Sequence, residues 1–235
     1  MIPPVLCITG IDTDIGKTIV TGLLARYLHT KGLRVMTQKL VQTGCVGVAE
    51  DILTHRTIMG LEPGVEDTSG LTCPYVFPTA CSPHLAAEIE GVIIDSTVID
   101  CATQALVDRY ETVLVEGAGG LLVPLNRELM LLDYLAQKGW PLVLVSSPRL
   151  GSINHTLAAL ELADSRGLTV LGIVYNRFQE GDPRIVADSA HVFRRALRQH
   201  GFNECVLDLF GLDVYGSDTN FPEFDCLFTA AAQCT

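Results

Sequence analysis

Short apolar runs alternate with segments of helical periodicity along most of the chain. The apolar runs that indicate buried strands are residues 5–8, 33–38, 112–116, 141–146 and 168–176. Helical spacing of apolar residues follows residue 16 and recurs over 52–59, 96–109, 129–137, 152–166 and 183–200. Apolar strands that alternate with helices are typical of a mainly parallel sheet covered by helices on both faces. We therefore predict one α/β domain over residues 1–235, in which the acidic segment 211–235 has no assigned structure.

Two segments lack both periodicities. Residues 40–49 are small and polar enough to surround a ligand. Residues 60–82 contain three prolines and indicate a long loop, and such loops inside compact domains are often functional. Ser82 suits a helix N-cap and Pro83 a first helical turn, so a helix is predicted to begin there.

Composition narrows the class of protein. The chain has 235 residues, of which 48% are hydrophobic, so it can bury one substantial core. Its net charge of −11 argues against a nucleic-acid partner, because such partners are held by neutralising many phosphates. No signal-peptide pattern and no apolar run of membrane-spanning length is present, which predicts a cytoplasmic protein without a membrane partner.

The cysteines and the acidic residues add two further expectations. None of the eight cysteines forms a Cys-x-x-Cys pair and no histidines stand at zinc spacing, which favours a reducing compartment. Cys7 and Cys101 lie within apolar patterns and are predicted to pack as small core residues. Residues 201–235 carry six acidic and no basic residues, which favours a solvated acidic tail over a partner-binding one.

The most informative motif lies between the first strand and the first helix, at residues 10–18. Gly16-Lys17-Thr18 follows an apolar strand and opens a helix, as in a phosphate-binding loop. The usual spacing requires a glycine five residues before Gly16, where Ile11 stands, and Gly10 lies one residue further back. We therefore predict a P-loop NTPase-like fold with a variant Walker A motif. The alternative is an ordinary strand–turn–helix in which Gly-Lys-Thr occurs by chance.

In this interpretation each residue type has a specific task. Backbone N–H groups and the helix N-terminus face the phosphates, Lys17 reaches the terminal phosphates and the Thr18 hydroxyl holds Mg²⁺. Mg²⁺ prefers oxygen ligands. Glu116 at a strand end and Asp51 at a helix start are further candidate ligands. Their alternatives are a solvated strand-end acid and a helix-capping acid, respectively.

Lys39 closes the second predicted strand, at the edge of a parallel sheet where ligands bind. It either extends to solvent or, if its strand neighbours the first, joins Lys17 as a second cation over a transferred phosphate. The run from Gly117 to Gly120 permits close backbone approach to an anion, or is a plain glycine turn. Asn176 ends a strand and suits a purine edge or a capped turn equally well. His84 and His155 receive no catalytic role.

Several of these motifs together resemble the dethiobiotin synthetase family. The segments that carry the resemblance span residues 5–177 in the family's order. They are Gly10–Thr18, Lys39–Gly44, Ser82-Pro83-His84, Val115–Gly120, Arg149–His155 and the strand ending at Asn176. The resemblance implies that ATP drives ring closure between 7,8-diaminononanoate and CO₂, through a carbamate and a carbamic-phosphoric anhydride, with release of ADP and phosphate. It also implies a homodimer that uses Mg²⁺.

The resemblance assigns roles by position. Those implied as catalytic are Lys17 and Lys39. Those implied for ATP are Asp14, Ile15, Gly16, Lys17, Thr18, Ile19, Glu116, Gly117, Ala118, Gly119 and Asn176. Those implied for the diamine or carbamate are Thr13, Lys39, Thr43, Gly151, Ser152 and Asn154, with the last three reached across the dimer interface. Those implied for Mg²⁺ are Thr18, Asp51 and Glu116.

The chain departs from the family pattern in two places. The loop between Thr43 and Asp51 is short, so Asp51 aligns less firmly than Glu116. Residues 205–211 lack the usual proline near the base, and the acidic segment that follows has no clear resemblance. Alternatives are another amidoligase of the same superfamily, a partner-regulating P-loop switch ATPase, or a binding protein that keeps the fold without activity. A switch ATPase normally carries a lysine near the start of the loop, which Gly10-Ile11-Asp12 lacks.

Overall fold

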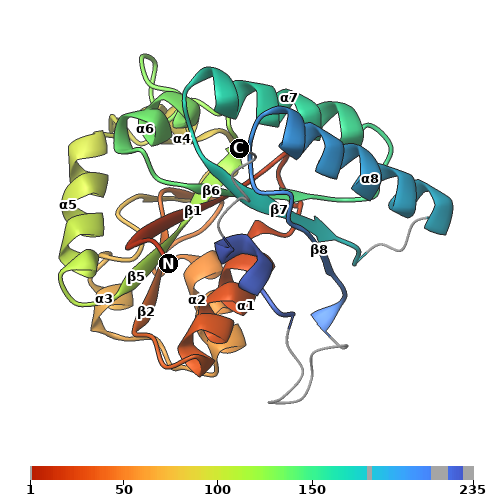
Figure 1. Ribbon diagram of the computed structural model, residues 1–235. Coiled ribbons are helices and arrows are strands. Elements are labelled where there is room, and N and C mark those ends of the chain that lie inside the picture. The colour runs from red at the N-terminus through yellow and green to blue at the C-terminus, as the bar shows by residue number, and fades with distance from the viewer. Residues whose placement is uncertain (1, 179–181, 213–221, 230–235) are drawn as a thin grey trace.

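A parallel sheet with helices on both faces forms the body of the molecule (Figure 1). This computed structural model describes residues 2–178, 182–212 and 222–229. Within these ranges six strands pair in the order β2-β5-β1-β6-β7-β8, and all neighbours are parallel. The strands are β1 (Val5–Gly10), β2 (Val35–Lys39), β5 (Thr112–Gly120), β6 (Leu142–Ser146), β7 (Val170–Asn176) and β8 (Val206–Leu209). The predicted α/β architecture is confirmed.

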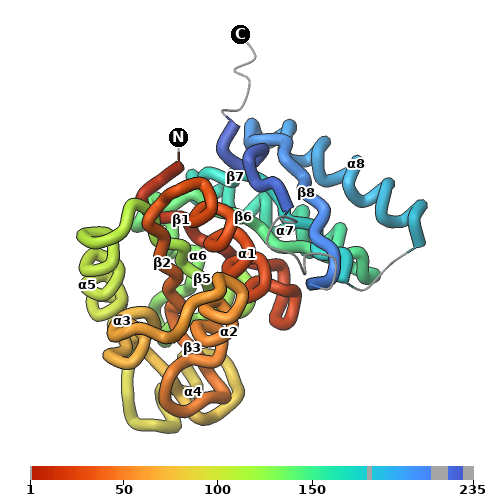
Figure 2. Tube along the Cα trace, turned by 90° about the horizontal axis from the view of Figure 1, so that it is seen from below, coloured from red at the N-terminus to blue at the C-terminus, as the bar shows by residue number. Residues whose placement is uncertain are grey.

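The helices divide between the two faces according to the side chains that alternate along the strands. Leu6 and Ile8 of β1 pack with α1 and α2, whereas Cys7 between them packs with α5, α6 and α7. Figure 2, seen from below, shows α1 and α2 together on their side of the sheet. The helices are α1 (Lys17–Thr30), α2 (Glu50–Met59), α3 (Val65–Thr68), α4 (Pro83–Ile89), α5 (Ser96–Val107), α6 (Leu131–Lys138), α7 (Ser152–Ser165) and α8 (Pro183–Gln199).

The strand order corrects the idea that the first two strands are neighbours. Strand β5 lies between β1 and β2, and the register places Glu116 opposite both Ile8 and Lys39. Lys17, just after β1, and Lys39, at the end of β2, therefore approach each other over the end of β5. The glutamate stands between two strands that each lead to a lysine.

Two loops are more regular than expected. Residues 60–82 contain α3 and the short strand β4 (Val76–Phe77), which pairs in parallel with β3 (Gln42–Thr43). Pairing β3 with β4 fixes the segment after Lys39 beside the segment that leads to α4. The run from Gly117 to Gly120 continues β5 instead of forming a separate turn. Ser82 does occupy the N-cap position of α4, with Pro83 in its first turn.

The described residues 222–229 of the acidic tail pack through their apolar side chains, while their acids, Glu223 and Asp225, are exposed. A 3₁₀ turn, Asp225–Phe228, lies against α1, and both Phe224 before it and Leu227 within it are fully buried. The Phe224 ring meets the Tyr27 ring edge to face at 5.5 Å, and the Tyr27 hydroxyl donates to Asp225 at 2.6 Å. The aromatic ring is therefore buried while the neighbouring acids stay in contact with solvent.

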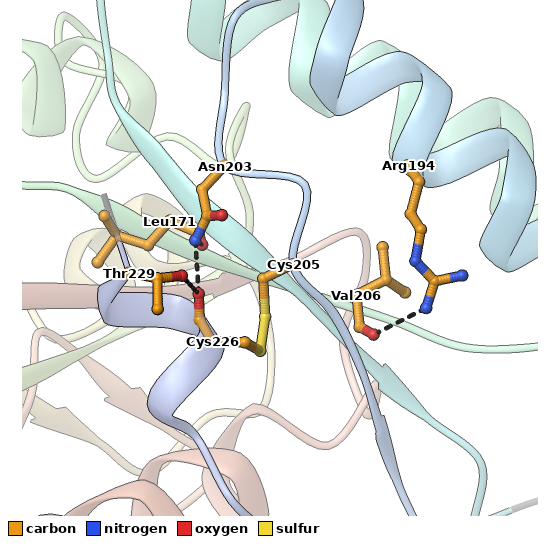
Figure 3. The surroundings of a disulfide bond; sticks show 7 residues. All are labelled: Leu171, Arg194, Asn203, Cys205, Val206, Cys226 and Thr229. Atoms are coloured by element: carbon orange, nitrogen blue, oxygen red, sulfur yellow. Dashed lines mark hydrogen bonds between the residues drawn. A yellow bond between two sulfur atoms is a disulfide. The ribbon is translucent and has the colours of Figure 1, made fainter. Parts of the chain in front are cut away.

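A disulfide joins Cys205, just before β8, to Cys226 in this turn (Figure 3). The Asn203 amide reinforces it by donating to the carbonyl oxygens of Leu171 and Cys226, at 2.8 and 2.7 Å. The C-terminal turn is thus held to strand β7 and to the segment that leads into the edge strand β8. Cys7 is buried as predicted, but Cys101 is exposed on α5, so its prediction as a core residue is wrong.

No helix among the described residues is both long and apolar enough to cross a membrane.

Candidate active site

The phosphate loop joins β1 to α1 through a backbone conformation that favours glycine. Gly16, immediately before the helix, has a φ of 100°, and Asp14 has a φ of 54°. A Cβ atom at Gly16 would also meet Nδ2 of Asn176, so a side chain here would have to displace that amide as well as adopt a left-handed conformation. Because a helix leaves its first N–H groups without intrahelical acceptors, this turn is suited to hold an anion.

Lys17 is buried at the start of α1. Its Nζ donates to the carbonyl oxygen of Asp12 at 2.8 Å, which keeps the side chain folded back over the loop. Burial, together with the charge of Lys39, lowers the pKa of Lys17 to about 8. An anion in the loop would relieve this penalty by favouring the charged form.

Lys39, Glu116 and Asp51 form an ion cluster where β2 and β5 end. Nζ of Lys39 lies 2.7 Å from Oε1 of Glu116 and 2.5 Å from Oδ2 of Asp51. Burial disfavours the charge on Lys39, yet the two carboxylates raise its pKa above the usual value. Burial likewise disfavours the charge on Glu116, but Lys39 and His55 hold its pKa well below the usual range. Both members of the buried pair are therefore ionised at neutral pH.

Oxygen atoms of the kind that Mg²⁺ prefers border this cluster. The Thr18 hydroxyl donates to Oε1 of Glu116 at 3.0 Å, and Lys39 bridges Glu116 to Asp51. No group of three or more His, Cys, Asp or Glu side chains forms a metal site within the described ranges. A Mg²⁺ ion that keeps water and phosphate oxygens needs few protein ligands, so one hydroxyl and two carboxylates fit a metal that arrives with a nucleotide.

His55 belongs to the cluster, although the sequence analysis gave it no role. It lies one helical turn after Asp51 on α2, is fully buried, and its Nε2 lies 2.8 Å from Oε2 of Glu116. The only signal in the sequence is the spacing of four residues, which places both side chains on one face of the helix. That signal has no value until Asp51 is known to face the site.

A cavity of about 820 Å³ opens over the loop and the cluster. The predicted residues that line it are Thr13, Asp14, Gly16, Lys17, Thr18, Ile19, Lys39, Thr43, Asp51, Glu116, Ala118 and Gly119. Its far wall is formed by residues 80–83, immediately before and within the start of α4, and by Val123. Both lysines, all three predicted metal ligands and the predicted substrate residues Thr13 and Thr43 thus surround one space.

Six predicted residues lie outside the lining of this cavity. They are Ile15, Gly117, Asn176, Gly151, Ser152 and Asn154. Asn176 supports the phosphate loop from behind, because its Nδ2 donates to the carbonyl oxygen of Ile15 at 2.9 Å. Its Oδ1 accepts from the N–H of Phe178 at 3.1 Å. The Asn176 amide therefore already uses one N–H donor and its oxygen in hydrogen bonds within the protein, which leaves little of it for a nucleotide base.

Gly151, Ser152 and Asn154 lie at the start of α7, outside the cavity lining in this single chain. Gly151 has a φ of 92°, Ser152 is buried and Asn154 is exposed. Arg149, just before this helix, forms an ion pair with Asp12 of the phosphate loop. The helix start is thus connected to the phosphate loop, although it does not line the same space.

Comparisons with known proteins identify the family. A family model described as an AAA domain matches residues 5–206. The ATP-dependent dethiobiotin synthetase BioD of Chlorobaculum tepidum is 54% identical over 206 residues, which cover 87% of this chain and 86% of that protein. The ATP-dependent dethiobiotin synthetase BioD 2 of Pasteurella multocida is 50% identical over 210 residues, covering 88% of this chain and 99% of that protein.

The chain belongs to the ATP-dependent dethiobiotin synthetase family. The membership confirms the resemblance found in the motifs and makes the protein an ATP-dependent ligase of biotin biosynthesis. Among solved structures, a ParA family ATPase from Chlorobium tepidum matches with a TM-score of 0.52 at 12% identity, covering 88% of this chain and 84% of that one. At that identity the likeness shows the fold alone, and it confirms the P-loop architecture. The roles of individual residues stay predictions.

Proposed function

We propose that the protein closes the cyclic urea of dethiobiotin from 7,8-diaminononanoate, CO₂ and ATP. One observation carries the proposal beyond the family: Lys17 at the start of α1 and Lys39 at the end of β2 converge with Glu116 of β5 on one cavity. Two cations over one acidic metal-binding edge suit a reaction in which an anion attacks the γ-phosphate. The proposal adds the substrates and the order of bond formation to the family assignment.

In the proposed sequence one amine adds to CO₂ and loses a proton, which gives a carbamate. A carbamate oxygen then attacks the γ-phosphorus and ADP leaves. The second amine attacks the carbonyl carbon of the mixed anhydride and loses a proton, the C–O bond to phosphate breaks, and the ring closes with release of phosphate. Each step joins groups held by the protein, so positioning and charge neutralisation supply most of the catalysis.

The chain's own residues divide this work. The turn at Gly16 and Lys17 would hold the phosphates of ATP, and Lys39 would neutralise the carbamate and the transferred phosphoryl group. Thr18, Asp51 and Glu116 would hold Mg²⁺, which when bound neutralises charge on the phosphate oxygens. Thr13, exposed on the phosphate loop, and Thr43, partly buried in β3, would contact the diamine or carbamate from the cavity wall.

The start of α7 has a proposed role in a homodimer. Helix N-termini favour anions, and Gly151, Ser152 and Asn154 would receive the distal carboxylate of a substrate bound to the second copy. The support is local: the helix has 14 residues, and Leu150 before it is fully exposed in the single chain.

The reaction is tested with purified protein, ATP, Mg²⁺, ¹³C-bicarbonate and the diamine. We expect one phosphate per dethiobiotin, a product one mass unit heavier than with ordinary bicarbonate, and no turnover when any component is omitted or EDTA is added. Phosphate release that does not need the diamine would identify a switch ATPase instead. No turnover in a folded, ATP-binding protein would identify a binding protein without activity.

A further inference from the structure

Glu116 has two carboxylate oxygens in different surroundings. Oε1 accepts from the Thr18 hydroxyl and from Nζ of Lys39, at 3.0 and 2.7 Å. Oε2 lies 2.8 Å from Nε2 of His55. Both Glu116 and His55 are fully buried, so water does not replace these partners. Each oxygen therefore has its own fixed protein donors.

The direction of the histidine hydrogen bond follows from the state of the carboxylate. An ionised carboxylate has no proton to donate, so Nε2 of His55 must carry the hydrogen. The other ring nitrogen, Nδ1, is buried without a hydrogen-bond partner among the described residues. The imidazole is thus committed to one polar contact, and that contact is with Glu116.

A single donor matters here because the end of a glutamate side chain rotates readily. The terminal carboxylate torsion is broad, and hydrogen bonds rather than the torsion itself fix it. With Oε2 held by His55, Oε1 points to the side of Thr18 and Lys39, which both line the cavity. Without the His55 donor, Oε2 would be buried without a hydrogen bond, and the carboxylate would rotate to form one with another group.

We propose that His55 is a positioning residue that directs Oε1 of Glu116 toward the metal. The proposal rests on the proposed function, because it takes Glu116 as a metal-binding carboxylate. Outer residues that orient metal ligands contribute to metal affinity, and their loss costs about 10- to 100-fold. Helix α2 would then serve the site twice, through Asp51 in its first turn and through His55 one turn later.

The proposal is tested with variants that separate the donor from the bulk of the ring. His55→Gln keeps an N–H donor at a similar reach, His55→Asn has a donor too short to reach, and His55→Leu has none. The matched control is Thr103→Val, which removes a buried hydrogen bond of 2.7 Å between Thr103 and Gln38, outside the cavity lining. Circular dichroism identifies the variants that fold.

The main readout is Mn²⁺ binding in the presence of ADP, followed by electron paramagnetic resonance, with no reaction taking place. We expect Mn²⁺ affinity to fall about 10- to 100-fold in His55→Asn and His55→Leu. In contrast, it should stay within about threefold of wild type in His55→Gln and in Thr103→Val. The Mg²⁺ concentration for half-maximal turnover should shift in the same pattern, with an unchanged KM for the diamine.

The outcomes separate this proposal from the proposed function. Folded His55→Asn and His55→Leu proteins that bind Mn²⁺ as tightly as wild type would overturn the positioning role while ring closure stands. If His55→Leu does not fold, equal Mn²⁺ affinity of the Asn and Gln variants overturns it as well. A wild type that binds Mn²⁺ and ADP but forms no dethiobiotin would instead overturn the proposed function.

Discussion

Two buried ionic clusters include neighbouring residues of α2. They differ in how many of their charged groups have all their hydrogen-bond partners within the protein. His55 contacts Glu116, and this first cluster lines the cavity with Lys39, Asp51 and Glu116. Arg56, the next residue, turns the other way and pairs with Asp67 of α3. Neither Arg56 nor Asp67 lines that cavity.

In the Arg56–Asp67 pair, both carboxylate oxygens and all three guanidinium nitrogens have hydrogen-bond partners within the protein. Arg56 donates from Nε and Nη2 to the two oxygens of Asp67 at 2.9 and 2.8 Å, and from Nη1 to Thr37. The carboxylate also accepts from the N–H of Gly64 and the hydroxyl of Thr72, both at 2.8 Å. This cluster ties α2 and α3 to β2, and its bonds have no need of a ligand.

The cluster around Lys39 meets solvent on one side. Asp51 keeps 22% of its side chain exposed, and Lys17, Lys39 and Thr18 all border the cavity. Burial of charge is therefore not by itself a sign of function, because both clusters are buried. The difference lies in whether the charged groups border a space that a ligand can enter.

The largest expected effect is on stability, in Arg56→Met. The substitution leaves the Asp67 carboxylate buried without its cation, and we expect the free energy of unfolding to fall by about 3–5 kcal/mol. The double variant Arg56→Met/Asp67→Leu should recover most of the loss, because no charge stays unpaired. Urea denaturation measures both. A loss below about 1 kcal/mol in the single variant would show that the pair does not hold α2.

Lys39→Ala is expected to lower turnover, which Arg56→Met should affect only through stability. Removing a cation that stabilises charge in the transition state should lower kcat by about 100- to 1000-fold. ATP affinity should change by only a few-fold, because the phosphate loop and Lys17 are intact. Lys138→Ala, which removes an ion pair with Asp100 at the far end of α6, is the control and should keep wild-type kcat. Wild-type turnover in Lys39→Ala would remove Lys39 from the mechanism.

Most of the fold and three of the four residues of the active-site cluster, Lys39, Asp51 and Glu116, follow from the sequence for identifiable reasons. Strands that are apolar throughout are distinctive, so the parallel sheet is predictable from pattern alone. Because ligands bind at the carboxyl ends of such strands, Lys39 and Glu116 stand out by position. Gly16 stands out by motif, since Gly-Lys-Thr marks the turn of a phosphate-binding loop before a helix.

What escaped prediction depends on contacts between distant segments. The apolar pattern of β5 does not say that it inserts between β1 and β2, so the placing of Glu116 between the lysines was not foreseen. His55 is one polar residue in a helix until β5 is placed beside it. The Cys205–Cys226 disulfide and the burial of Phe224 likewise join parts of the chain that no local periodicity relates.

Two threonines allow a smaller, matched comparison of the clusters. Thr72 donates to Asp67, and Thr18 donates to Glu116. Thr72→Val should lower the free energy of unfolding by about 1.5–3 kcal/mol, the range for a hydrogen bond to a charged group. Thr18→Val should lower that free energy much less, because the hydrogen bond of Thr18 is only partly buried and borders the cavity.

The same Thr18→Val variant should need about tenfold more Mg²⁺ for half-maximal turnover, a change equivalent to about 1.4 kcal/mol. Thr72→Val should need no more Mg²⁺ than wild type. Denaturation curves and Mg²⁺ titrations of both proteins provide the four measurements. If the two variants lost stability and metal response in the same proportion, the division between a structural and a functional cluster would be wrong.

The smallest expected effect is on the free energy of unfolding at acid pH. Burial disfavours the charge on Asp67, but Arg56 and the other donors lower the pKa of its carboxyl below the usual value of about 3.9. The unfolded chain therefore binds this proton at a higher pH than the folded one. The stability that Asp67 contributes is complete above about pH 4 and is lost as the pH falls through the lower, folded pKa.

We therefore expect the stability difference between wild type and Asp67→Asn to be constant from pH 7 to about pH 5 and to shrink below about pH 4. The control is Asp188→Asn, at an exposed position on α8 without an ion pair among those found in the described residues. Urea denaturation at each pH gives the difference directly. A wild-type advantage over Asp67→Asn that stayed constant down to pH 3 would mean that Asp67 is not held as an anion, and that Arg56 stabilises α2 by packing instead of by charge.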